Sequence, residues 1–291
     1  MNKKNTKGSN EIVDGGLYLV ATPIGNLGDI SIRALDILKG VDLIAAEDTR
    51  VTLRLLNHFN ISKTLISYHE HNKVVKGNYL IEELLKGTSV ALVTDAGTPG
   101  ISDPGEDLVK LAIENNIKVI PIPGSTAMIC GLISSGLPTG RFVFEGFLPM
   151  NKVDRKQRLQ DIKDEMRTII LYEAPHKLLK TLKNLFDLLG DRTIVLAREL
   201  TKKYEEFIRL SLSQAIVKYE VDSPRGEFVI IISGRKGILG GPSEGITDDE
   251  IIKVYNEFIS NGIEKKDAIK KTAVQLDVKK RDVYQLVLEL K

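Results

Sequence analysis

The sequence is short of several residue types and features, and each shortage excludes something. Tryptophan is absent, and the single cysteine, Cys130, excludes an intrachain disulfide and is expected to be a small buried apolar residue. No apolar run is long enough to cross a membrane and no signal peptide is recognisable, so we expect a cytoplasmic protein without a membrane partner. Lysine and arginine (41) nearly balance aspartate and glutamate (39), and the net charge of +2 excludes a strongly basic nucleic-acid binder while leaving room for a local basic patch.

Apolar and amphipathic segments alternate along the first part of the chain. Short apolar runs such as Leu17–Ala21 and Val90–Val93 are typical of buried strands, and intervening segments such as Thr52–His58 have the apolar spacing of helices. Strands separated by helices pair in parallel, because a parallel connection needs a crossover. We therefore predict an N-terminal α/β domain over residues 16–123, after a polar, flexible tail over residues 1–15.

The pattern changes near Gly124. Strand-like runs such as "RFVFEGFL" and "EFVIIISG" alternate with helical segments in a less regular order. This predicts a second α/β domain with mixed strand directions over residues 124–236. The glycine-rich stretch "GRKGILGGPSEG" predicts a linker, which we assign to residues 237–246.

Residues 247–291 are expected to form a small helical domain. Thr247 stands before three acidic residues and is typical of a helix N-cap. The apolar spacing that follows resembles a helix-turn-helix, with Asp277 at the turn position where glycine is common. The cations near the start of its last helix are candidate nucleic-acid contacts: Lys279, Lys280 and Arg281. An alternative interpretation is equally favoured, in which these helices form only a structural cap and the lysines are solvated.

The stretch "VTDAGTPGISDPG" (residues 93–105) forms a loop rich in glycine and proline after an apolar strand. It has no lysine to meet a phosphate, which excludes a Walker loop, and it lacks the G-x-G-x-x-G spacing of a dinucleotide site. Gly97 and Gly100 remove side chains from the loop wall, while Thr98 and Ser102 supply hydroxyls. Such a neutral, backbone-rich concavity suits a cationic or zwitterionic ligand such as S-adenosylmethionine, although a purely structural turn also fits.

Other polar loops lie at the ends of predicted strands. "PIPGSTA", "YEAPHK" and "LARELTKKYEE" follow strands, and "DSPRGE" precedes one. Ser125 is expected to cap the helix after "PIPGSTA". Because ligands of α/β sheets collect beyond the carboxyl ends of strands, these loops predict one cleft shared by two domains.

The histidines do not complete a metal site. His69 and His71 in "SYHEHN" could chelate with Glu70 and His58, since they are alternate residues of a loop. No third and fourth ligand has convincing spacing, so we expect no metal.

A series of motifs between Leu17 and Ile232 resembles one family. In chain order they are "LYLVATPIGNLGDISIRAL", "AAEDTR", "SYHEHN", "VTDAGTPGISDPG", "IPGSTA", "GRFVFEGFLP", "YEAPHK", "ARELTKKYEE" and "RGEFVIII". Together they resemble the tetrapyrrole methylase superfamily and, within it, the bacterial enzymes that methylate a cytidine 2′-hydroxyl in 16S rRNA. The resemblance implies a two-domain tetrapyrrole-methylase-like α/β fold with a small C-terminal helix-turn-helix-like domain. It also implies that S-adenosylmethionine binds between the two α/β domains and that the protein is a homodimer. The implied partner is 16S rRNA in the small ribosomal subunit, and the methylated cytidine would lie in its decoding region.

The resemblance assigns residues to the cofactor. Thr98 stands where many relatives have aspartate, and Ile101 is an apolar contact. The residues implied to bind the cofactor are Asp95, Gly97, Thr98, Pro99, Gly100, Ile101, Ser102, Ser125, Thr126, Ala127, Tyr172, Ala197, Pro224, Arg225 and Gly226. Leu210 departs from the family pattern, which has glycine there, and this affects only the local turn.

The reaction expected from this resemblance is an in-line displacement, in which a ribose 2′-oxygen attacks the methyl carbon of the sulfonium. Candidate catalytic residues are Glu47, Asp48 and Arg50, which could help remove the hydroxyl proton, and a structural ion-pair network is the alternative. Cations expected to meet RNA phosphates are Arg141, Lys152, Arg155, Lys156, Lys279, Lys280 and Arg281.

Two other functions remain open. The first is methylation of a tetrapyrrole or corrinoid precursor in the same cofactor cleft. The second is a non-catalytic RNA-binding protein that acts through its terminal helices.

Overall fold

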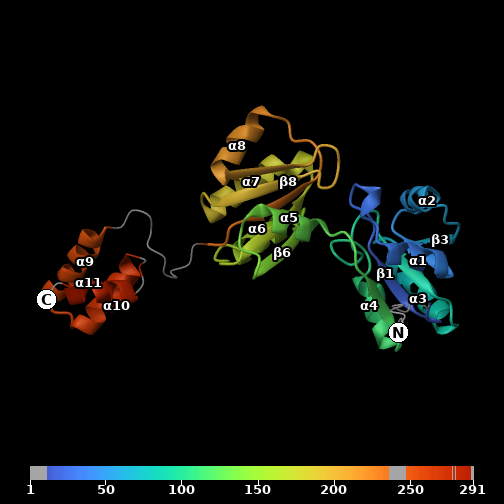
Figure 1. The fold of residues 1–291 in the computed structure, drawn as a ribbon, viewed down its shortest axis with the longest axis horizontal. Coiled ribbons are helices and arrows are strands. Elements are labelled where there is room, and N and C mark those ends of the chain that lie inside the picture. Colours follow the sequence, from blue (N-terminus) through green and yellow to red (C-terminus); the bar gives the residue numbers. More distant parts are fainter. Residues whose placement is uncertain (1–11, 236–246, 277, 279, 290–291) are drawn as a thin grey trace, which may run out of the picture. The chain divides into compact units, whose positions relative to one another are not determined.

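The computed structural model describes residues 12–235, 247–276, 278 and 280–289. They form two compact units, one ending at Gly234 and the other beginning at Arg235 (Figure 1). The predicted linker, residues 237–246, lies outside the described residues, as do residues 1–11 of the predicted tail. No helix in the described part of the chain is long and apolar enough to cross a membrane.

The first five strands form one sheet in the order β3-β2-β4-β1-β5, and all its pairings are parallel, as predicted. The strands are β1 (Leu17–Val20), β2 (Leu43–Ala46), β3 (Thr64–Ser67), β4 (Val90–Val93) and β5 (Val119–Ile122). Every residue of β2 and β4 is buried, because helices cover both faces of the sheet, and this explains their uninterrupted apolar sequence. The loops after β1, β2, β4 and β5 leave the sheet at one edge.

Helices cover the two faces of this sheet in pairs. α1 (Ile32–Gly40) and α2 (Thr49–His58) pack on one face, and α3 (Lys73–Leu85) and α4 (Glu106–Glu114) pack on the other. The short 3-10 helix η1 (Leu27–Asp29) precedes α1. These two layers form the first hydrophobic core and fix the positions of the loops at the strand ends.

The second sheet has the order β6-β7-β10-β8-β9 and mixed strand directions, as predicted, because β6 and β7 are parallel and the other pairings are antiparallel. Its strands are β6 (Phe142–Phe147), β7 (Thr168–Glu173), β8 (Thr193–Arg198), β9 (Glu206–Ser211) and β10 (Phe228–Ile232). α5 (Ala127–Ser135) packs on one face. The opposite face is covered by α6 (Lys152–Asp161), α7 (Pro175–Leu189) and α8 (Leu212–Val221).

In the second unit, the described residues form three helices around a small core of their own. They are α9 (Asp248–Ser260), α10 (Lys265–Gln275) and α11 (Lys280–Glu289). Thr247 caps α9 as predicted, because its hydroxyl accepts a hydrogen bond of 3.3 Å from the Glu250 amide. Asp277 and Lys279, which the sequence placed at the turn and the start of the last helix, lie outside the described residues.

A substitution at the centre of the second sheet tests the hydrophobic core between that sheet and its helices. Ile230 in β10 is completely buried on the sheet face covered by α6, α7 and α8, so Ile230→Ala should lower the free energy of unfolding by about 2–5 kcal/mol. The control is Val221→Ala at the end of α8, where the side chain is 85% exposed and the expected change is within about 0.5 kcal/mol. Urea denaturation measures both, and equal effects of the two substitutions would contradict the packing described.

Candidate functional site

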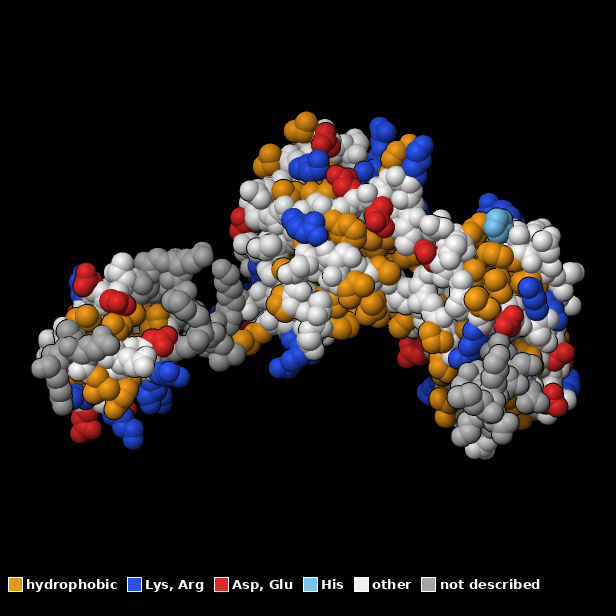
Figure 2. All heavy atoms as spheres, viewed as in Figure 1, with side chains coloured by type: hydrophobic (Ala, Val, Ile, Leu, Met, Phe, Trp, Pro, Cys, Tyr) orange, Lys and Arg blue, Asp and Glu red, His pale blue; other side chains and the backbone are white. Residues whose placement is uncertain are grey.

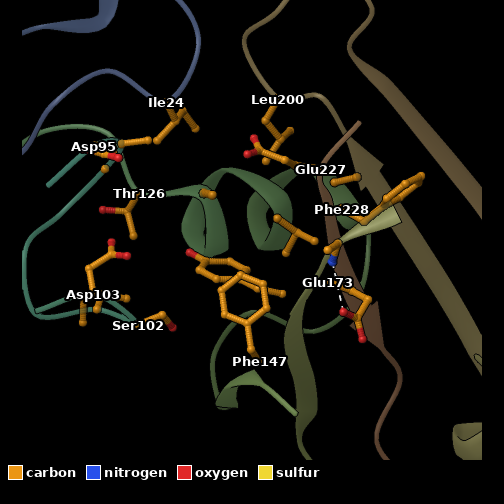
Figure 3. Close-up of a pocket in the computed structure, with 18 of the residues that line it drawn as sticks. Ile24, Asp95, Ser102, Asp103, Thr126, Phe147, Glu173, Leu200, Glu227 and Phe228 are labelled. Carbon is orange, nitrogen blue, oxygen red and sulfur yellow. Dashed lines mark hydrogen bonds between the residues drawn. The ribbon is translucent and has the colours of Figure 1, made fainter. Parts of the chain in front are cut away.

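A cavity of about 540 Å³ lies in the α/β unit, with walls contributed by both sheets. Its size is that of a small-molecule site. Loops after strands of the first sheet form one wall, and β7, β10 and the loop after β8 form the other. Figure 3 shows the first wall through Asp95, Thr126, Asp103 and Ser102, and the second through Leu200, Glu227, Phe228 and Glu173. The loops predicted from sequence to share a cleft are therefore brought together.

The loop after β4 contributes most of the first wall and is held from two sides. Gly97 and Thr22 exchange two backbone hydrogen bonds of 2.8 and 3.1 Å, which join this loop to the one after β1. On its other side the Thr98 hydroxyl donates to the Ser125 carbonyl at 3.1 Å and lies 2.8 Å from the Thr126 hydroxyl. Gly97 has a φ of +91°, which favours glycine. The wall is therefore fixed by the protein itself.

The sequence-predicted cofactor residues divide into lining and supporting groups. Those that line the cavity are Asp95, Gly97, Thr98, Ile101, Ser102, Thr126, Ala127, Tyr172 and Ala197. Those that do not line it are Pro99, Gly100, Ser125, Pro224, Arg225 and Gly226. Ser125 is also not the cap of α5, contrary to the sequence prediction, because Thr126 holds the N-cap position. Neither hydroxyl caps the helix, since that of Thr126 lies beside Thr98 instead.

The turn containing Pro224, Arg225 and Gly226 supports the second wall. Gly226 has a φ of +80°, and a Cβ there would lie 2.4 Å from Cγ of Glu199. Glu199 in turn accepts a hydrogen bond of 3.0 Å from the amide of Glu227, which lines the cavity. Glycine is thus required for the close approach that positions Glu227.

Left-handed backbone conformation marks the rim of the cavity at three residues that are not glycine. Ser102, Glu199 and Thr201 have φ values of +64°, +50° and +65°. Ser102 lines the cavity, and the other two flank the lining residue Leu200. Such conformations carry a cost of about 1–3 kcal/mol each and cluster at functional sites. No sequence signal marks these positions, because serine, glutamate and threonine do not favour this backbone.

Five carboxylates line the cavity, and no lysine or arginine does so among the described residues. Glu47, Asp95 and Asp103 belong to the first wall, and Glu173 and Glu227 belong to the second. Burial raises the pKa of Asp103 to about 7, and the charges of Glu47 and Asp95 add to this effect. Burial is also the main cause that raises the pKa values of Glu47 and Asp95. The cavity therefore favours a positively charged ligand, which would relieve the crowding of negative charge.

Asp103 was not among the cofactor residues predicted from sequence, and neither were Glu173, Phe147 and His176, which also line the cavity. The only sequence signal that could have identified these residues was their position in motifs already assigned to the site. Asp103 belongs to the same glycine- and proline-rich loop as Ile101, and Glu173 and His176 belong to the strand-end motif "YEAPHK".

Aromatic rings form an apolar part of the lining. Tyr172 packs edge-on against Phe147, with ring centroids 5.5 Å apart. Its hydroxyl accepts a hydrogen bond of 3.0 Å from the Met128 amide at the start of α5. Burial raises the pKa of Tyr172 to about 12, so the phenol stays neutral. The site thus combines an aromatic apolar surface with a cluster of carboxylates, a combination suited to a ligand with an aromatic ring and a positive charge.

The three predicted catalytic residues are separated by the structure. Glu47 lines the cavity, whereas Asp48 and Arg50 do not. Asp48 caps α2 and pairs with Arg50 at 2.6 Å, and this pairing holds the pKa of Asp48 well below its usual range. The structural ion pair, which the sequence left open as the alternative, therefore describes Asp48 and Arg50.

The predicted RNA-binding cations differ in their availability. Arg141, Lys152, Lys156, Lys280 and Arg281 are exposed, and Lys279 lies outside the described residues. Arg155 is half-buried and is held against α7, because it donates to Asn184 at 3.1 Å and to Thr181 at 2.7 Å. Figure 2 shows lysine and arginine side chains interspersed with acidic ones on the visible face of each unit, rather than one continuous basic surface.

Comparison with known families identifies the class of this protein. Residues 16–216 match the sequence profile of the tetrapyrrole (corrin/porphyrin) methylases, and the chain belongs to this family. Solved structures with the same fold include the methyltransferase CobJ, with a TM-score of 0.58 and 18% identity over 77% of this chain and 97% of CobJ. Uroporphyrin-III C-methyltransferase from Thermus thermophilus, solved with S-adenosylhomocysteine, has a TM-score of 0.53 and 17% identity over 74% of this chain and 96% of that one. The predicted fold is confirmed.

More similar relatives share one name, Ribosomal RNA small subunit methyltransferase I. The protein of this name from Synechocystis sp. is 49% identical over 279 residues, which cover 95% of this chain and 98% of the relative. The Bacillus subtilis protein is 47% identical over 271 residues, or 93% of each chain. The resemblance noted in the sequence is therefore confirmed.

The family is one of S-adenosylmethionine-dependent methyltransferases, and S-adenosylmethionine is the cofactor of this chain. The cavity fits this cofactor, because its carboxylates match a sulfonium and an ammonium group and its aromatic side matches an adenine ring. Glu47, Asp95 and Asp103 would hold the positive charge, and the backbone of the loop after β4 would hold polar groups.

The pKa of Asp103 predicts how cofactor binding depends on pH. A cation binds more tightly when Asp103 is ionised, and with a pKa of about 7 the ionised fraction falls about tenfold between pH 8 and pH 6. The dissociation constant of S-adenosylmethionine should therefore rise by up to about tenfold over that interval, as calorimetry can measure. Asp103→Asn removes this titration, so any remaining pH dependence belongs to other groups. An identical pH dependence in both proteins would contradict the role of Asp103.

Proposed function

We propose that this chain is a small-subunit rRNA methyltransferase that transfers a methyl group from S-adenosylmethionine to the 2′-hydroxyl of a cytidine in the decoding region of 16S rRNA. The observation that carries the proposal is the identity of 43–49% with curated relatives named Ribosomal RNA small subunit methyltransferase I, over 93–95% of the chain in the alignments that span the helical unit. The cavity supports it, since its carboxylates suit a sulfonium donor. Such a substrate places the enzyme in the cytoplasm, with the ribosomal subunits.

The chain's own contribution to catalysis is positioning. The cofactor supplies an activated methyl group, so alignment of the acceptor oxygen with that group accounts for much of the rate. Gly97 and Thr98 fix the wall that binds the cofactor through their bonds to Thr22 and Ser125. This wall needs little rearrangement when the ligand binds, which favours precise orientation.

Contacts to RNA phosphates are proposed for the exposed cations Arg141, Lys152, Lys156, Lys280 and Arg281. They lie on both compact units, and a few contacts of this kind suit a chain with a net charge of only +2. Arg155 is left out of this set, because its guanidinium already bonds to α7.

The substrate can be tested by mapping 2′-O-methylated nucleotides. A strain that lacks this protein should lose one 2′-O-methylcytidine from its 16S rRNA, and the purified protein should restore that mark in small subunits from this strain. Free tetrapyrrole precursors should remain unmethylated under the same conditions. Methylation of a tetrapyrrole without methylation of rRNA would replace this proposal by the alternative substrate class.

A homodimer is part of the proposed assembly. Ile129 and Ile133 lie one turn apart on α5 and are 38% and 67% exposed, which provides an apolar surface for a second copy. Light scattering should give twice the chain mass of 32.3 kDa for the wild type and a lower mass for Ile133→Asp. A monomeric wild type would contradict the dimer, and an unchanged dimer in Ile133→Asp would place its interface elsewhere.

A further inference from the structure

A second, smaller cavity of about 220 Å³ lies directly beside the cofactor cavity. Its apolar side is formed by Val51 and Leu55 of α2, and its polar side includes Thr22, Thr94, Arg54 and Asp95. Asp95 is the one described residue that lines both cavities. The two spaces are therefore neighbours at Asp95.

The backbone around Asp95 is fixed by the joined loops after β1 and β4. The bridge between Thr22 and Gly97 lies two residues beyond Asp95, and the Thr22 hydroxyl donates to the Thr94 carbonyl at 3.1 Å. Asp95 follows β4 closely and stands between these two anchors. Its side chain is thus held at the boundary, and Figure 3 shows it beside Ile24 at the edge of the larger cavity.

The Asp95 carboxylate has one oxygen engaged and one available. Oδ1 accepts a hydrogen bond of 3.1 Å from the Asp48 amide, which orients the group. The Asp95 amide donates to Glu47 at 3.3 Å. Within the described part of the chain, no hydrogen bond reaches Oδ2. Partial burial raises the pKa of Asp95, and a higher pKa makes a carboxylate a stronger proton acceptor.

Arg54 provides a positive charge at the smaller cavity. Its side chain is exposed and forms no hydrogen bond or ion pair with any other described residue. Arg50, one turn earlier on α2, is 86% exposed and pairs with Asp48 through only part of its donor set. An apolar pocket with an exposed arginine and several hydroxyls matches a nucleotide, whose base is flat and whose phosphate is negative.

We propose that the smaller cavity receives the target nucleotide and that Asp95 is the catalytic base for its ribose hydroxyl. This inference rests on the proposed function. Oδ2 of Asp95 accepts the proton of the 2′-hydroxyl, and the 2′-oxygen uses the freed electron pair to bond the methyl carbon. The carbon–sulfur bond breaks with its electron pair remaining on sulfur, which becomes a neutral thioether. Asp95, now a carboxylic acid, returns its proton to solvent.

Substitution of Asp95 tests the catalytic part. In Asp95→Asn the shape is kept and the base is lost, so kcat on small subunits should fall by about 10²- to 10⁴-fold. The dissociation constant for the small subunit, measured by binding, should change by less than about threefold. That for S-adenosylmethionine should rise less than in Asp103→Asn, although Asp95 also faces the cofactor cavity. Asp95→Glu should recover part of the rate because it restores a carboxylate. Asp103→Asn is the matched comparison, because Asp103 lines only the cofactor cavity and its loss should mainly weaken cofactor binding.

Substitution of Arg54 tests the nucleotide site. Arg54→Ala should raise KM for the small subunit by about tenfold, corresponding to ~1.4 kcal/mol, with kcat within about twofold. Arg33→Ala is the control, since Arg33 is also exposed, lies on α1 and lines neither cavity. Binding of the small subunit by the cofactor-free protein gives a second readout of the same difference.

The outcomes separate this inference from the proposed function. Full activity in Asp95→Asn, or a loss of cofactor binding as large as in Asp103→Asn, would overturn the role of Asp95. Equal behaviour of Arg54→Ala and Arg33→Ala would overturn the nucleotide site. A wild-type protein that methylates no rRNA would instead overturn the proposed function, and the variants would not be needed to see it.

Discussion

The crowding of Glu47, Asp95 and Asp103 on one wall of the cavity is the interaction on which the rest of the site depends. Glu47 follows β2, and Asp95 and Asp103 belong to the loop after β4. β2 and β4 pair in parallel, with Leu43 opposite Val90 and Ala46 opposite Val93. The side chains that follow the two strands therefore meet at the same edge of the sheet. Like charges at close range disfavour one another's ionisation. The site is consequently prepared for a positive ligand by the topology of the sheet.

Much of this arrangement is readable in the sequence because it depends on local pattern. The uninterrupted apolar runs of β2 and β4 predict buried parallel strands, and in such sheets the loops at the carboxyl ends carry the ligand. Gly97, in a loop without lysine, indicates close backbone approach to a ligand that is not a phosphate. These features predict the fold class and a ligand-binding loop after β4, whereas the cofactor itself is implied by the resemblance to the methylase family.

What the sequence did not predict depends on packing between distant segments. Asp103 faces the cavity after a left-handed residue, Ser102, and serine gives no signal for that conformation. Arg155 belongs to a basic stretch that suggested RNA contacts, but its partners Thr181 and Asn184 lie on another helix. The cap of α5 was assigned to Ser125 because a local rule ignores the contact between Thr98 and Thr126. For Arg155 and for the cap of α5, the deciding neighbour is remote in the chain.

The carboxylate cluster has a consequence for turnover. A methyl donor enters as a sulfonium, and after the reaction its sulfur is uncharged. Glu47, Asp95 and Asp103 then face a ligand that has lost the charge they attracted, while its adenine and amino-acid parts are the same. We therefore expect the cavity to bind the spent ligand less firmly than the fresh one, which would ease exchange between them in the forward direction. Charge placement in this cleft therefore serves ligand release as well as ligand capture.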